Sequence, residues 1–479
     1  MRRAKIVATL GPALDDEGRL KAALAAGIDV VRLNFSHGTH AEHERRLSRV
    51  RTMADQLGRT VGALGDLQGP KIRLGLLPEP GIPLEDGSEV VLVSGVEEVD
   101  DHDDGTGTPV LPVVYEQLAD DVEPGALVLI EDGLIRLVAA RVEGNTVTAR
   151  VVAGGIAKSR KGVNLPGVAV SAGCLTDKDR EDLAAMVDME VDWVALSFVR
   201  RASDVTEVRD LIHGHGGEAP VVAKLERPEA MTNLESIVAA TDAVMVARGD
   251  LGVEIGPERV PALQKRIIDI SNDAGRPVIT ATEMLDSMIR SPRPTRAEAS
   301  DVANAIFDGT DAVMLSGETA AGRYPVEAVR TMARIIEVAE SSEHLLHAPP
   351  KQRQDASVSR IVAKAAVEVA ADVHAKALLV FSLSGSSVQL VSKFRPSTPL
   401  VGLTPDHRSL RRMALMWGTR ALDVPTKDDS RALTLAAEEV CLRSGLAAPG
   451  DSVVIVSGIP GGHGGTNRLL VHEIGGVPD

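Results

Sequence analysis

The chain has 479 residues, 44% of them hydrophobic and 25% charged, which is enough for about two to four domains with complete cores. Its formal net charge of −16 argues against a nucleic-acid partner, because a phosphate backbone is bound by a basic surface. With two cysteines (Cys174 and Cys441), no signal-peptide pattern and no apolar run of the ~18 residues that a membrane helix needs, we expect a cytoplasmic protein without disulfides or membrane segments.

Short apolar runs rich in Val and Ile recur along the chain, and each ends in a polar or charged cluster. The runs cover residues 5–12, 29–38, 61–70, 191–198, 221–227, 243–252, 277–285 and 312–320. Most are separated by about 20 to 35 residues with helical periodicity, as βα units require. Eight such units favour a (β/α)8 TIM barrel over the alternative of a doubly wound sheet, because the loops after the strands form the active face of a barrel.

Two further domains are expected outside this pattern. Over residues 70–169 the apolar residues alternate with period two between turns at 85–87 and 143–145, which predicts an all-β lid domain inserted between barrel segments 1–69 and 170–345. A polar, Pro-containing linker at 347–357 then leads to a C-terminal α/β domain over residues 357–479.

Polar side chains follow the predicted barrel strands. They are Arg32, Asn34 and Ser36; Asp66, Lys71 and Arg73; Lys224 and Glu226; Arg248 and Asp250; Thr280 and Thr282; and Ser316 and Glu318. A single residue of this kind is usually part of a solvated salt bridge. Because the carboxyl ends of barrel strands meet at one rim, the combination predicts an active site.

The residue types indicate phosphoryl transfer. Glu226 and Asp250 are hard carboxylates that suit Mg²⁺ or Mn²⁺, and no His or Cys pair is nearby to favour zinc. Arg32, Arg73 and Lys224 suit phosphate oxygens and developing negative charge. Active sites for phosphoryl transfer usually contain a divalent metal beside fixed cationic side chains. There is no Walker loop, so a nucleotide would have to bind between barrel and lid.

Several longer stretches resemble the pyruvate kinase family. They are RLNFSHG (32–38), GPKIR (69–73), KGVNLPG (161–167), VARGDLGVEI (246–255), TATEMLDSM (280–288) and the run 292–320. The resemblance is colinear from residue 4 to about residue 340 and continues more weakly through the C-terminal domain. It implies phosphoryl transfer from phosphoenolpyruvate to ADP, giving pyruvate and ATP as the last step of glycolysis, by a homotetramer.

The resemblance also implies residue roles. Lys224 would neutralise the transferring phosphoryl group and the enolate, and Glu226 and Asp250 would bind the metal. Substrate would be held by Ala247, Gly249, Asp250 and Thr282. The nucleotide and its phosphates would be held by Arg32, Asn34, His37, Arg73 and Lys161, with Pro12 nearby. Ser316 would belong to the polar network that leads to a proton donor, whose identity the sequence leaves open.

Lys71 distinguishes this chain from many members of the family. Those members bind K⁺ at the residues equivalent to Asn34, Ser36 and Asp66, and carry Glu where this chain has Lys71. We expect the tethered ammonium to replace the monovalent cation, so that the enzyme needs Mg²⁺ but not K⁺. The alternative is an exposed salt bridge between Lys71 and Asp66.

The segment FSLSGSSV (381–388) predicts a strand end, a small-residue turn and a helix start. Its candidate ligands are Ser382, Ser384, Gly385, Ser386 and Ser387. Amides at a helix N-terminus together with hydroxyls suit a phosphate, although an ordinary capped turn has the same pattern. The resemblance implies a regulatory domain with a phosphorylated allosteric effector, either a sugar phosphate or a nucleoside monophosphate.

Two other functions fit part of the pattern. A metal-dependent aldolase would share the carboxylates and an arginine but would need neither the β insertion nor Lys71 and Arg73. A non-catalytic regulator that binds phosphorylated metabolites is disfavoured because Lys224, Glu226, Asp250 and Thr282 are all present.

Overall fold

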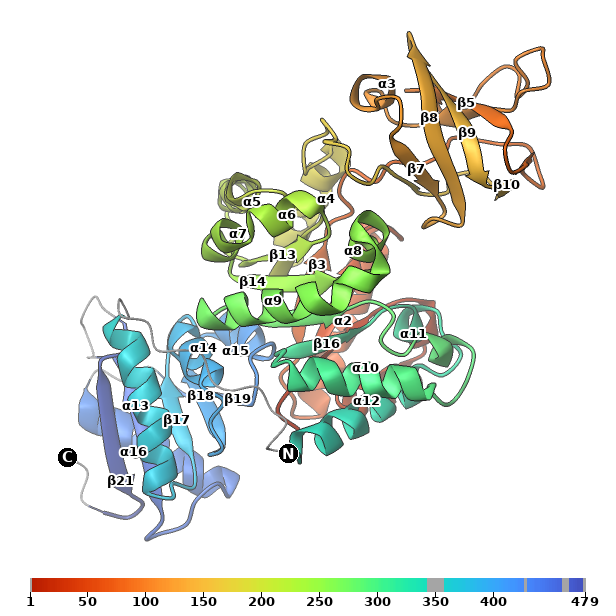
Figure 1. The fold of residues 1–479 in the computed structure, drawn as a ribbon. Helices are drawn as coiled ribbons and strands as arrows, with labels where there is room; N and C mark the ends of the chain where they lie inside the picture. The colour runs from red at the N-terminus through yellow and green to blue at the C-terminus, as the bar shows by residue number, and fades with distance from the viewer. Residues whose placement is uncertain (1, 343–356, 426–428, 459–464, 477–479) are drawn as a thin grey trace.

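The computed structural model describes residues 2–342, 357–425, 429–458 and 465–476. These residues form three units in a row, with a β-rich domain at one end, a barrel in the middle and a C-terminal α/β domain at the other end (Figure 1). The predicted linker at 347–357 lies outside the described residues except for its last residue. Among the described residues, no helix combines the length and apolar character needed to cross a membrane.

The central unit is a closed barrel of eight parallel strands. The strands are β1 (Lys5–Thr9), β2 (Val30–Asn34), β3 (Gly62–Asp66), β12 (Trp193–Leu196), β13 (Val221–Leu225), β14 (Ala243–Ala247), β15 (Val278–Ala281) and β16 (Ala312–Leu315). Neighbours around the barrel are in the order β1-β16-β15-β14-β13-β12-β3-β2. Each predicted apolar run contains one of these strands, so the prediction of a (β/α)8 barrel is confirmed and the doubly wound sheet is excluded.

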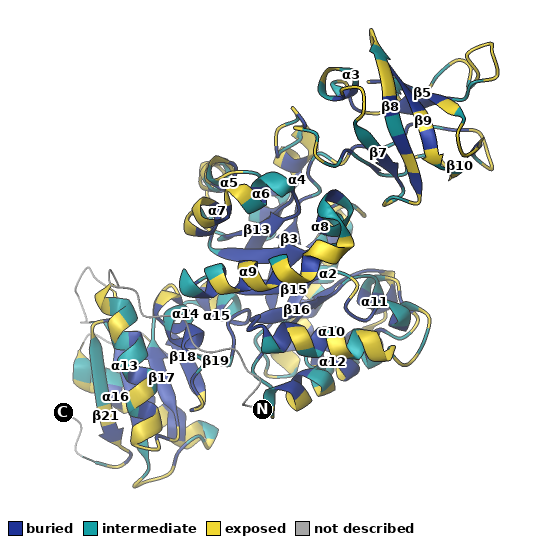
Figure 2. Ribbon diagram, in the orientation of Figure 1, coloured by how far each residue is buried: buried dark blue, intermediate teal, exposed yellow. Residues whose placement is uncertain are grey.

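Helices surround the barrel and turn their apolar faces inward (Figure 2). They include α1 (Glu17–Ala26), α2 (His40–Gln56), α4 (Asp177–Asp188), α5 (Ala202–Gly214), α6 (Pro228–Thr232), α7 (Leu234–Ala240), α8 (Arg248–Ile255), α9 (Val260–Asp273), α10 (Arg296–Phe307), α11 (Gly317–Ala320) and α12 (Pro325–Glu340). Several begin with a Thr whose hydroxyl accepts the amide of an acidic residue three positions on. Thr176 and Asp179 form one such capping box at the start of α4.

The inserted domain is built on a six-stranded sheet, in the order β11-β7-β8-β9-β5-β6, with a small second sheet of β10 and β4. Its elements are β4 (Ile82–Leu84), β5 (Glu89–Ser94), β6 (Val110–Val113), α3 (Leu118–Asp121), β7 (Leu127–Ile130), β8 (Ile135–Glu143), β9 (Thr146–Ala153), β10 (Gly155–Ala157) and β11 (Val163–Asn164). The domain has a hydrophobic core of its own. A narrow neck, formed by its two connecting segments, joins it to the barrel in Figure 1.

The C-terminal domain is a five-stranded sheet in the order β19-β18-β17-β20-β21. Its elements are α13 (Val358–Asp372), β17 (Leu378–Phe381), α14 (Ser386–Lys393), β18 (Leu400–Thr404), α15 (His407–Met413), β19 (Thr419–Asp423), α16 (Ser430–Ser444), β20 (Ser452–Ser457) and β21 (Arg468–Glu473). The edge strand β21 is partly exposed and has a charged residue at each end.

The C-terminal domain closes the end of the barrel where the strands begin. Ala414 and Leu415 pack in one cluster with Trp193 and other side chains from the barrel interior. The approach is so close that a Cβ on Gly62 would lie 2.7 Å from the carbonyl oxygen of Arg411. A glycine at the start of β3 is therefore needed for this contact.

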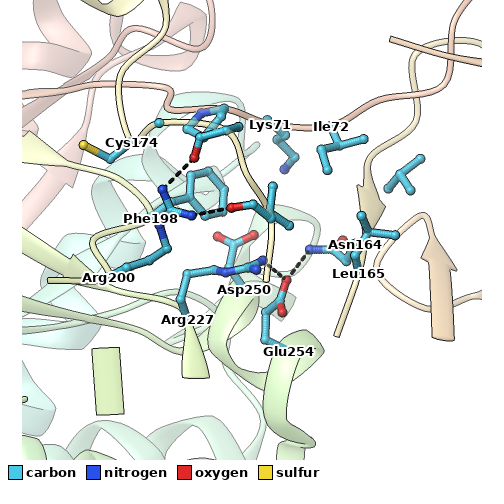
Figure 3. A pocket seen from close by; sticks show the side chains of 15 residues that line it. Lys71, Ile72, Asn164, Leu165, Cys174, Phe198, Arg200, Arg227, Asp250 and Glu254 are labelled. Carbon is cyan, nitrogen blue, oxygen red and sulfur yellow. Dashed lines mark hydrogen bonds and ion pairs between the residues drawn. The ribbon is translucent and has the colours of Figure 1, made fainter. Parts of the chain in front are cut away.

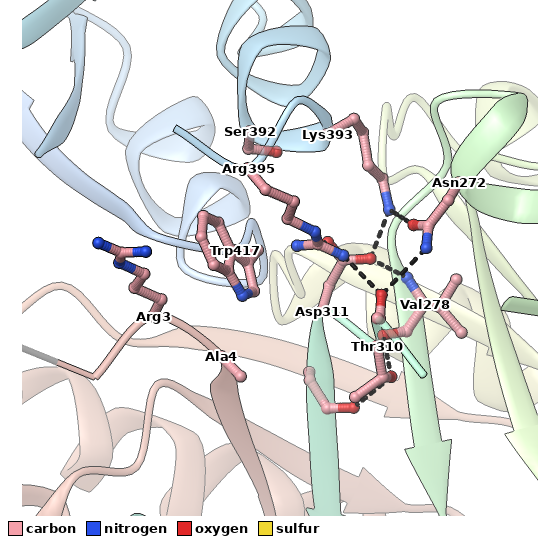
Figure 4. Close-up of polar contacts among 12 residues, drawn as sticks. Arg3, Ala4, Asn272, Val278, Thr310, Asp311, Ser392, Lys393, Arg395 and Trp417 are labelled. Atoms are coloured by element: carbon pink, nitrogen blue, oxygen red, sulfur yellow. Dashed lines mark hydrogen bonds and ion pairs between the residues drawn. The ribbon is translucent and has the colours of Figure 1, made fainter. Parts of the chain in front are cut away.

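A buried charge cluster joins the two domains at the same place (Figure 4). The Lys393 ammonium lies 2.5 Å from Asp311 Oδ2 and donates to Asn272 Oδ1 at 2.7 Å, and Arg395 Nη1 lies 2.9 Å from Asp311 Oδ1. Burial lowers the pKa of Lys393 to about 8 although Asp311 opposes the shift. Burial would raise the pKa of Asp311, but Arg395 and Lys393 outweigh it and lower that pKa. The interface therefore depends on a carboxylate that compensates two cations.

We expect Asp311→Asn to destabilise the protein by about 3–5 kcal/mol, because two cations lose their counter-charge while the acceptor for the Val278 amide is retained. The denaturation midpoint of the intact chain measures the effect. The matched control is Glu190→Gln, which removes an ion pair with Arg408 at the same interface, where both side chains are about half exposed. This change should cost less than about 1 kcal/mol. Equal shifts for the two variants would contradict the assignment.

Candidate active site

Lys224 is the centre of the charged rim at the carboxyl ends of the barrel strands. Its ammonium lies 3.2 Å from Asp66 Oδ1 and 3.0 Å from Glu226 Oε1. The side chains of Asp66 and Glu226 are each 1% exposed, and that of Lys224 is 11% exposed. Lys224 and Glu226 are two residues apart, so the alternation of an extended chain places both on one side. The fold has thus gathered residues that are up to 160 positions apart.

The buried charges set one another's protonation. Burial alone would lower the pKa of Lys224, but the carboxylates of Asp66 and Glu226 outweigh it and raise that pKa. Burial raises the pKa of Glu226, and the nearby Asp250 adds to the increase while Lys224 opposes it. Burial would also raise the pKa of Asp66, but Lys224 and Arg32 lower it. Lys224 therefore carries a full positive charge at neutral pH.

Asp66 is a structural anchor of this cluster. Arg32 Nε donates to its Oδ2 at 2.6 Å, and Arg32 Nη1 also donates to the hydroxyl of Thr9 at 3.1 Å. Asn34 lies beside Asp66 in the β2–β3 register, and its side-chain oxygen accepts the amide of Ser36 at 3.2 Å. The expected cation ligands Asn34, Ser36 and Asp66 are thus neighbours.

Lys71 does not reach Asp66. Both carboxylate oxygens face Arg32 and Lys224, and within the described ranges no ion pair joins Lys71 to Asp66. Lys71 is instead an exposed residue on the segment that leads into the inserted domain. The physical reason is that Gly69 and Pro70 turn the chain away from the rim before Lys71, so its side chain lines the space between the two domains.

The two carboxylates proposed from the sequence fit a divalent metal. Glu226 Oε2 accepts the amide of Phe198 at 2.8 Å, and the buried Oε1 lies 3.0 Å from the Lys224 ammonium. Asp250 lies in the first turn of α8, close enough to affect the pKa of Glu226. The described residues contain no cluster of three or more metal-ligating side chains. A metal here would need substrate oxygens and water to complete its coordination, as is typical of Mg²⁺.

The turn from β14 into α8 carries the residues expected to hold a substrate carboxylate. Ala247 ends β14 and Gly249 follows in α8. The Gly249 amide donates to the hydroxyl of Thr282 at 2.8 Å, so a substrate would have to displace this bond. Thr282 has a φ of +70°, which is strained for a β-branched residue. Such strain is commonly found at functional positions.

Arg248 is not a cation of the rim. Its guanidinium donates to the carbonyl oxygens of Ala281 and Thr282 at 3.1 and 2.7 Å and to Asp301 at 2.7 Å. It therefore holds the strained end of β15 in place.

Thr280 and Glu318 are buried, and Ser316 is partly exposed. Thr280 donates to the hydroxyl of Thr310 and is 0% exposed, so it does not reach the rim. Glu318 accepts the amides of Ser316 at 2.7 Å and Leu285 at 3.0 Å, and burial raises its pKa. The hydroxyl of Ser316 is buried without a hydrogen-bond partner in the described part of the chain. It is thus free to accept or donate a bond to a ligand.

A cluster of cations surrounds His37 beyond the rim. Burial lowers the pKa of His37, and the charges of Arg73, Lys71 and Arg32 lower it further. Arg73 also donates to the Arg160 carbonyl at 3.1 Å, on the segment that returns from the inserted domain. The positive field expected for phosphate binding is therefore present on this side of the site.

Lys161 forms an ion pair within the inserted domain. Its ammonium lies 2.5 Å from Glu131 Oε1. The sequence pattern could not reveal this pair, because Glu131 is 30 residues away in the sequence. The role of Lys161 toward a nucleotide stays a prediction.

A cleft of about 1200 Å³ separates the inserted domain from the barrel. On the barrel side it is lined by Gly249, Asp250 and Thr282, and on the other side by residues of β7 and β8 such as Leu129 and Arg136. A cleft of this size can hold a nucleotide-sized ligand against the charged rim.

Contacts that the sequence analysis missed hold the returning segment against the barrel (Figure 3). Arg200 donates to the carbonyl oxygens of Val170 at 2.5 Å and Ala172 at 2.6 Å. Arg227 lies 2.7 Å from Glu254, which also accepts from Asn164 at 3.5 Å. These partners come from distant segments, so no local motif could have identified them.

The serine-rich loop precedes α14 in the C-terminal domain (Figure 1). Gly385 has a φ of +84° and precedes α14. Ser384 donates to Ser386 at 3.1 Å, and the Ser387 amide donates to Ser382 at 3.4 Å. The expected turn and helix start are present, and the hydroxyls are close together.

Comparisons with known proteins agree with the site. The family model described as pyruvate kinase, barrel domain, matches residues 1–329, and the model for the pyruvate kinase alpha/beta domain matches residues 360–472. A pyruvate kinase of Geobacillus stearothermophilus is 45% identical over 482 residues, covering 99% of this chain and 80% of the relative. One from Mycobacterium tuberculosis is 46% identical over 477 residues, covering 99% of both chains.

A solved structure is similar over the whole fold. The crystal structure of a pyruvate kinase from Cryptosporidium parvum superimposes with a TM-score of 0.90 at 32% identity, covering 99% of this chain and 96% of the other. Both relatives and structure favour this family over a metal-dependent aldolase.

Proposed function

This chain belongs to the pyruvate kinase family, and from that membership we propose that it transfers the phosphoryl group of phosphoenolpyruvate to ADP with Mg²⁺ as cofactor, giving ATP and pyruvate. The observation that carries the proposal is the buried Lys224 ammonium between Asp66 and Glu226 at the barrel rim. A fixed positive charge in a desolvated site stabilises the charge that develops during phosphoryl transfer.

The chain's own residues would divide the work as follows. Lys224 stays protonated and would face both the transferring phosphoryl group and the enolate oxygen. Arg32 and Arg73 would hold phosphate oxygens on the side of His37. Glu226 and Asp250 would hold Mg²⁺, which when bound supplies Lewis-acid stabilisation to anionic oxygens.

The turn from β14 into α8 would orient the substrate. The amides of Ala247, Gly249 and Asp250 and the hydroxyl of Thr282 would hold the carboxylate, which takes the place of the bond between Gly249 and Thr282. Ser316, with its unpartnered hydroxyl, would belong to the path of the proton that reaches the enolate. The inserted domain would close over the cleft and exclude water.

We expect Lys224→Met to reduce turnover by ~10²-fold or more, because the site loses its preorganised charge. The measurement is pyruvate formation from phosphoenolpyruvate and ADP in a coupled assay. Lys21→Met, at an exposed position on α1, is the matched control and should retain the activity of the unaltered chain. A mild effect at Lys224 would contradict its assigned role.

We also propose that this enzyme does not require K⁺. Lys71 adds a fixed positive charge to the Arg32, Arg73 and His37 cluster, as its influence on the pKa of His37 indicates. That charge would help to position the phosphates, which is the task of the monovalent cation in K⁺-dependent members.

The unaltered chain should therefore turn over in Mg²⁺ with a tetraalkylammonium salt as the only monovalent cation. Lys71→Glu reverses the charge and should make activity depend on added K⁺, whereas Lys158→Glu, in the inserted domain, should not. Turnover of the unaltered chain that is near zero and is restored by K⁺ would refute the proposal.

Finally, we propose that the loop of Ser382, Ser384, Gly385, Ser386 and Ser387 binds the phosphate of an allosteric effector. Hydroxyls and the amides at the start of α14 supply the donors. Since the loop itself contains no Lys or Arg, we expect a monophosphate to bind better than a bisphosphate.

Ser384→Asp should abolish the response to the effector, because it adds a negative charge at an exposed position in the loop. Saturation curves for phosphoenolpyruvate with glucose 6-phosphate, AMP or fructose 1,6-bisphosphate measure this response. Ser236→Asp, at an exposed position on α7, should leave it unchanged. An effector response that survives Ser384→Asp would place the site elsewhere.

A further inference from the structure

Ser197 is a buried serine that lies between the charged groups of the rim. Asp66 and Lys224 belong to β3 and β13, and β12 lies between these two strands in the barrel. Ser197 is the first residue after β12, and it is 1% exposed. The strand order thus inserts one hydroxyl among the ionised side chains.

The hydroxyl of Ser197 has one proton, and the structure accounts for it. Ser197 Oγ donates to the carbonyl oxygen of Leu67 at 2.7 Å and accepts from Lys224 Nζ at 2.6 Å. Because the proton is committed to Leu67, a lone pair of the oxygen is directed to the ammonium. Ser197 therefore acts as a fixed acceptor for Lys224.

This hydrogen bond differs from the two ion pairs of Lys224. Asp66 Oδ1 and Glu226 Oε1 lie 3.2 and 3.0 Å from the ammonium and are charged, whereas the Ser197 hydroxyl is neutral. An ammonium has three protons, and these three oxygen atoms are its neighbours. The carboxylates balance the charge, and the hydroxyl helps to fix the position of the ammonium.

Phe198, the next residue, binds the neighbouring carboxylate of Glu226. The amide of Phe198 donates to Glu226 Oε2 at 2.8 Å, and Phe198 has a φ of +56°. Such a conformation is costly for a bulky residue and persists only where the surroundings enforce it. Ser197 and Phe198 together orient Lys224 and Glu226.

The same two residues touch the segment that leads into the inserted domain. A Cβ on Gly69 would lie 2.6 Å from the Phe198 ring and 3.0 Å from Ser197 Cβ. The Gly69 amide is held by Asp179, at 3.0 Å, and the carbonyl of Leu67 accepts the Ser197 proton. The position of this segment therefore sets the orientation of the hydroxyl.

We infer that Ser197 is a positioning residue for phosphoryl transfer, whose hydroxyl fixes the position of the Lys224 ammonium at the rim. The inference rests on the proposed role of Lys224. Removing a supporting hydrogen-bond partner of this kind usually costs about 10- to 100-fold in activity.

The experiment compares Ser197→Ala with the unaltered chain and with Ser271→Ala. Ser271 is 0% exposed on α9, and its hydroxyl has no hydrogen-bond partner among the described residues, so it controls for loss of a buried hydroxyl. Ser197→Ala should lower kcat by about 10- to 100-fold and change KM for ADP by less than about threefold, whereas Ser271→Ala should leave both unchanged.

A double mutant distinguishes positioning from a structural role. If Ser197 acts through Lys224, adding Ser197→Ala to Lys224→Met should change kcat by less than about twofold, because there is no ammonium left to position. A loss of activity that is equally large in the Lys224→Met background would overturn the inference. So would a Ser197→Ala variant whose kcat is within about twofold of the unaltered chain.

Binding measurements supply a second readout that does not need turnover. Mn²⁺ affinity, followed by electron paramagnetic resonance, should be unchanged in Ser197→Ala since the Phe198 amide still orients Glu226. Oxalate, a planar dianion that resembles the enolate, should bind at least about tenfold more weakly. Equal weakening of both ligands, or of neither, would overturn the inference.

Ser197→Cys is the second variant to test if Ser197→Ala does not fold. The thiol keeps the shape of the side chain but is a weak acceptor, so the same losses are expected. If the unaltered chain produces no pyruvate, the proposed function fails, and the oxalate measurement still decides the role of Ser197.

Discussion

The site depends on one electrostatic constraint, which is that a lysine ammonium is held inside the barrel rim by carboxylates that are themselves buried. Removing an ion from water costs several kcal/mol, and the cost is offset only when opposite charges and hydrogen bonds surround it. Asp66 and Glu226 supply the charges, and Arg32 keeps Asp66 ionised from the other side. The result is a charge that is ready before substrate arrives, so little reorganisation is needed during the reaction.

The strands β15 and β16 have the interface with the C-terminal domain at one end and the candidate active site at the other. β15 and β16 begin at Val278 and Ala312, next to the buried Asp311 that anchors the C-terminal domain. They end just before Thr282 and Ser316, at the rim. The helix α14 starts at the serine-rich loop and ends at Lys393, which contacts Asp311. A short rigid element thus connects the proposed effector loop with strands whose other ends carry site residues.

The inserted domain has its own core and joins the barrel through two segments, so it can move as a body. Each segment is tied to the rim by buried contacts. Asp179 accepts the amides of Gly69 on the outgoing segment and Thr176 on the returning one. Gly69 also packs on Phe198, whose amide orients Glu226. A movement of the inserted domain that shifts Gly69 would therefore also shift the charged groups of the rim.

The sequence by itself determined the strands, the barrel and the chemical type of the site, because apolar periodicity and polar strand ends are local properties of the chain. It also placed Lys224 and Glu226 on one side, since alternation along a strand needs only neighbouring residues. Local pattern could not reveal that Arg248 turns away to hold β15, that Lys161 pairs with Glu131, or that Lys71 stands apart from Asp66. Nor could it single out Ser197, a lone serine with no motif. Those assignments were decided only by the tertiary structure, because each depends on which distant groups compete for the same charge or hydrogen bond once the chain has folded.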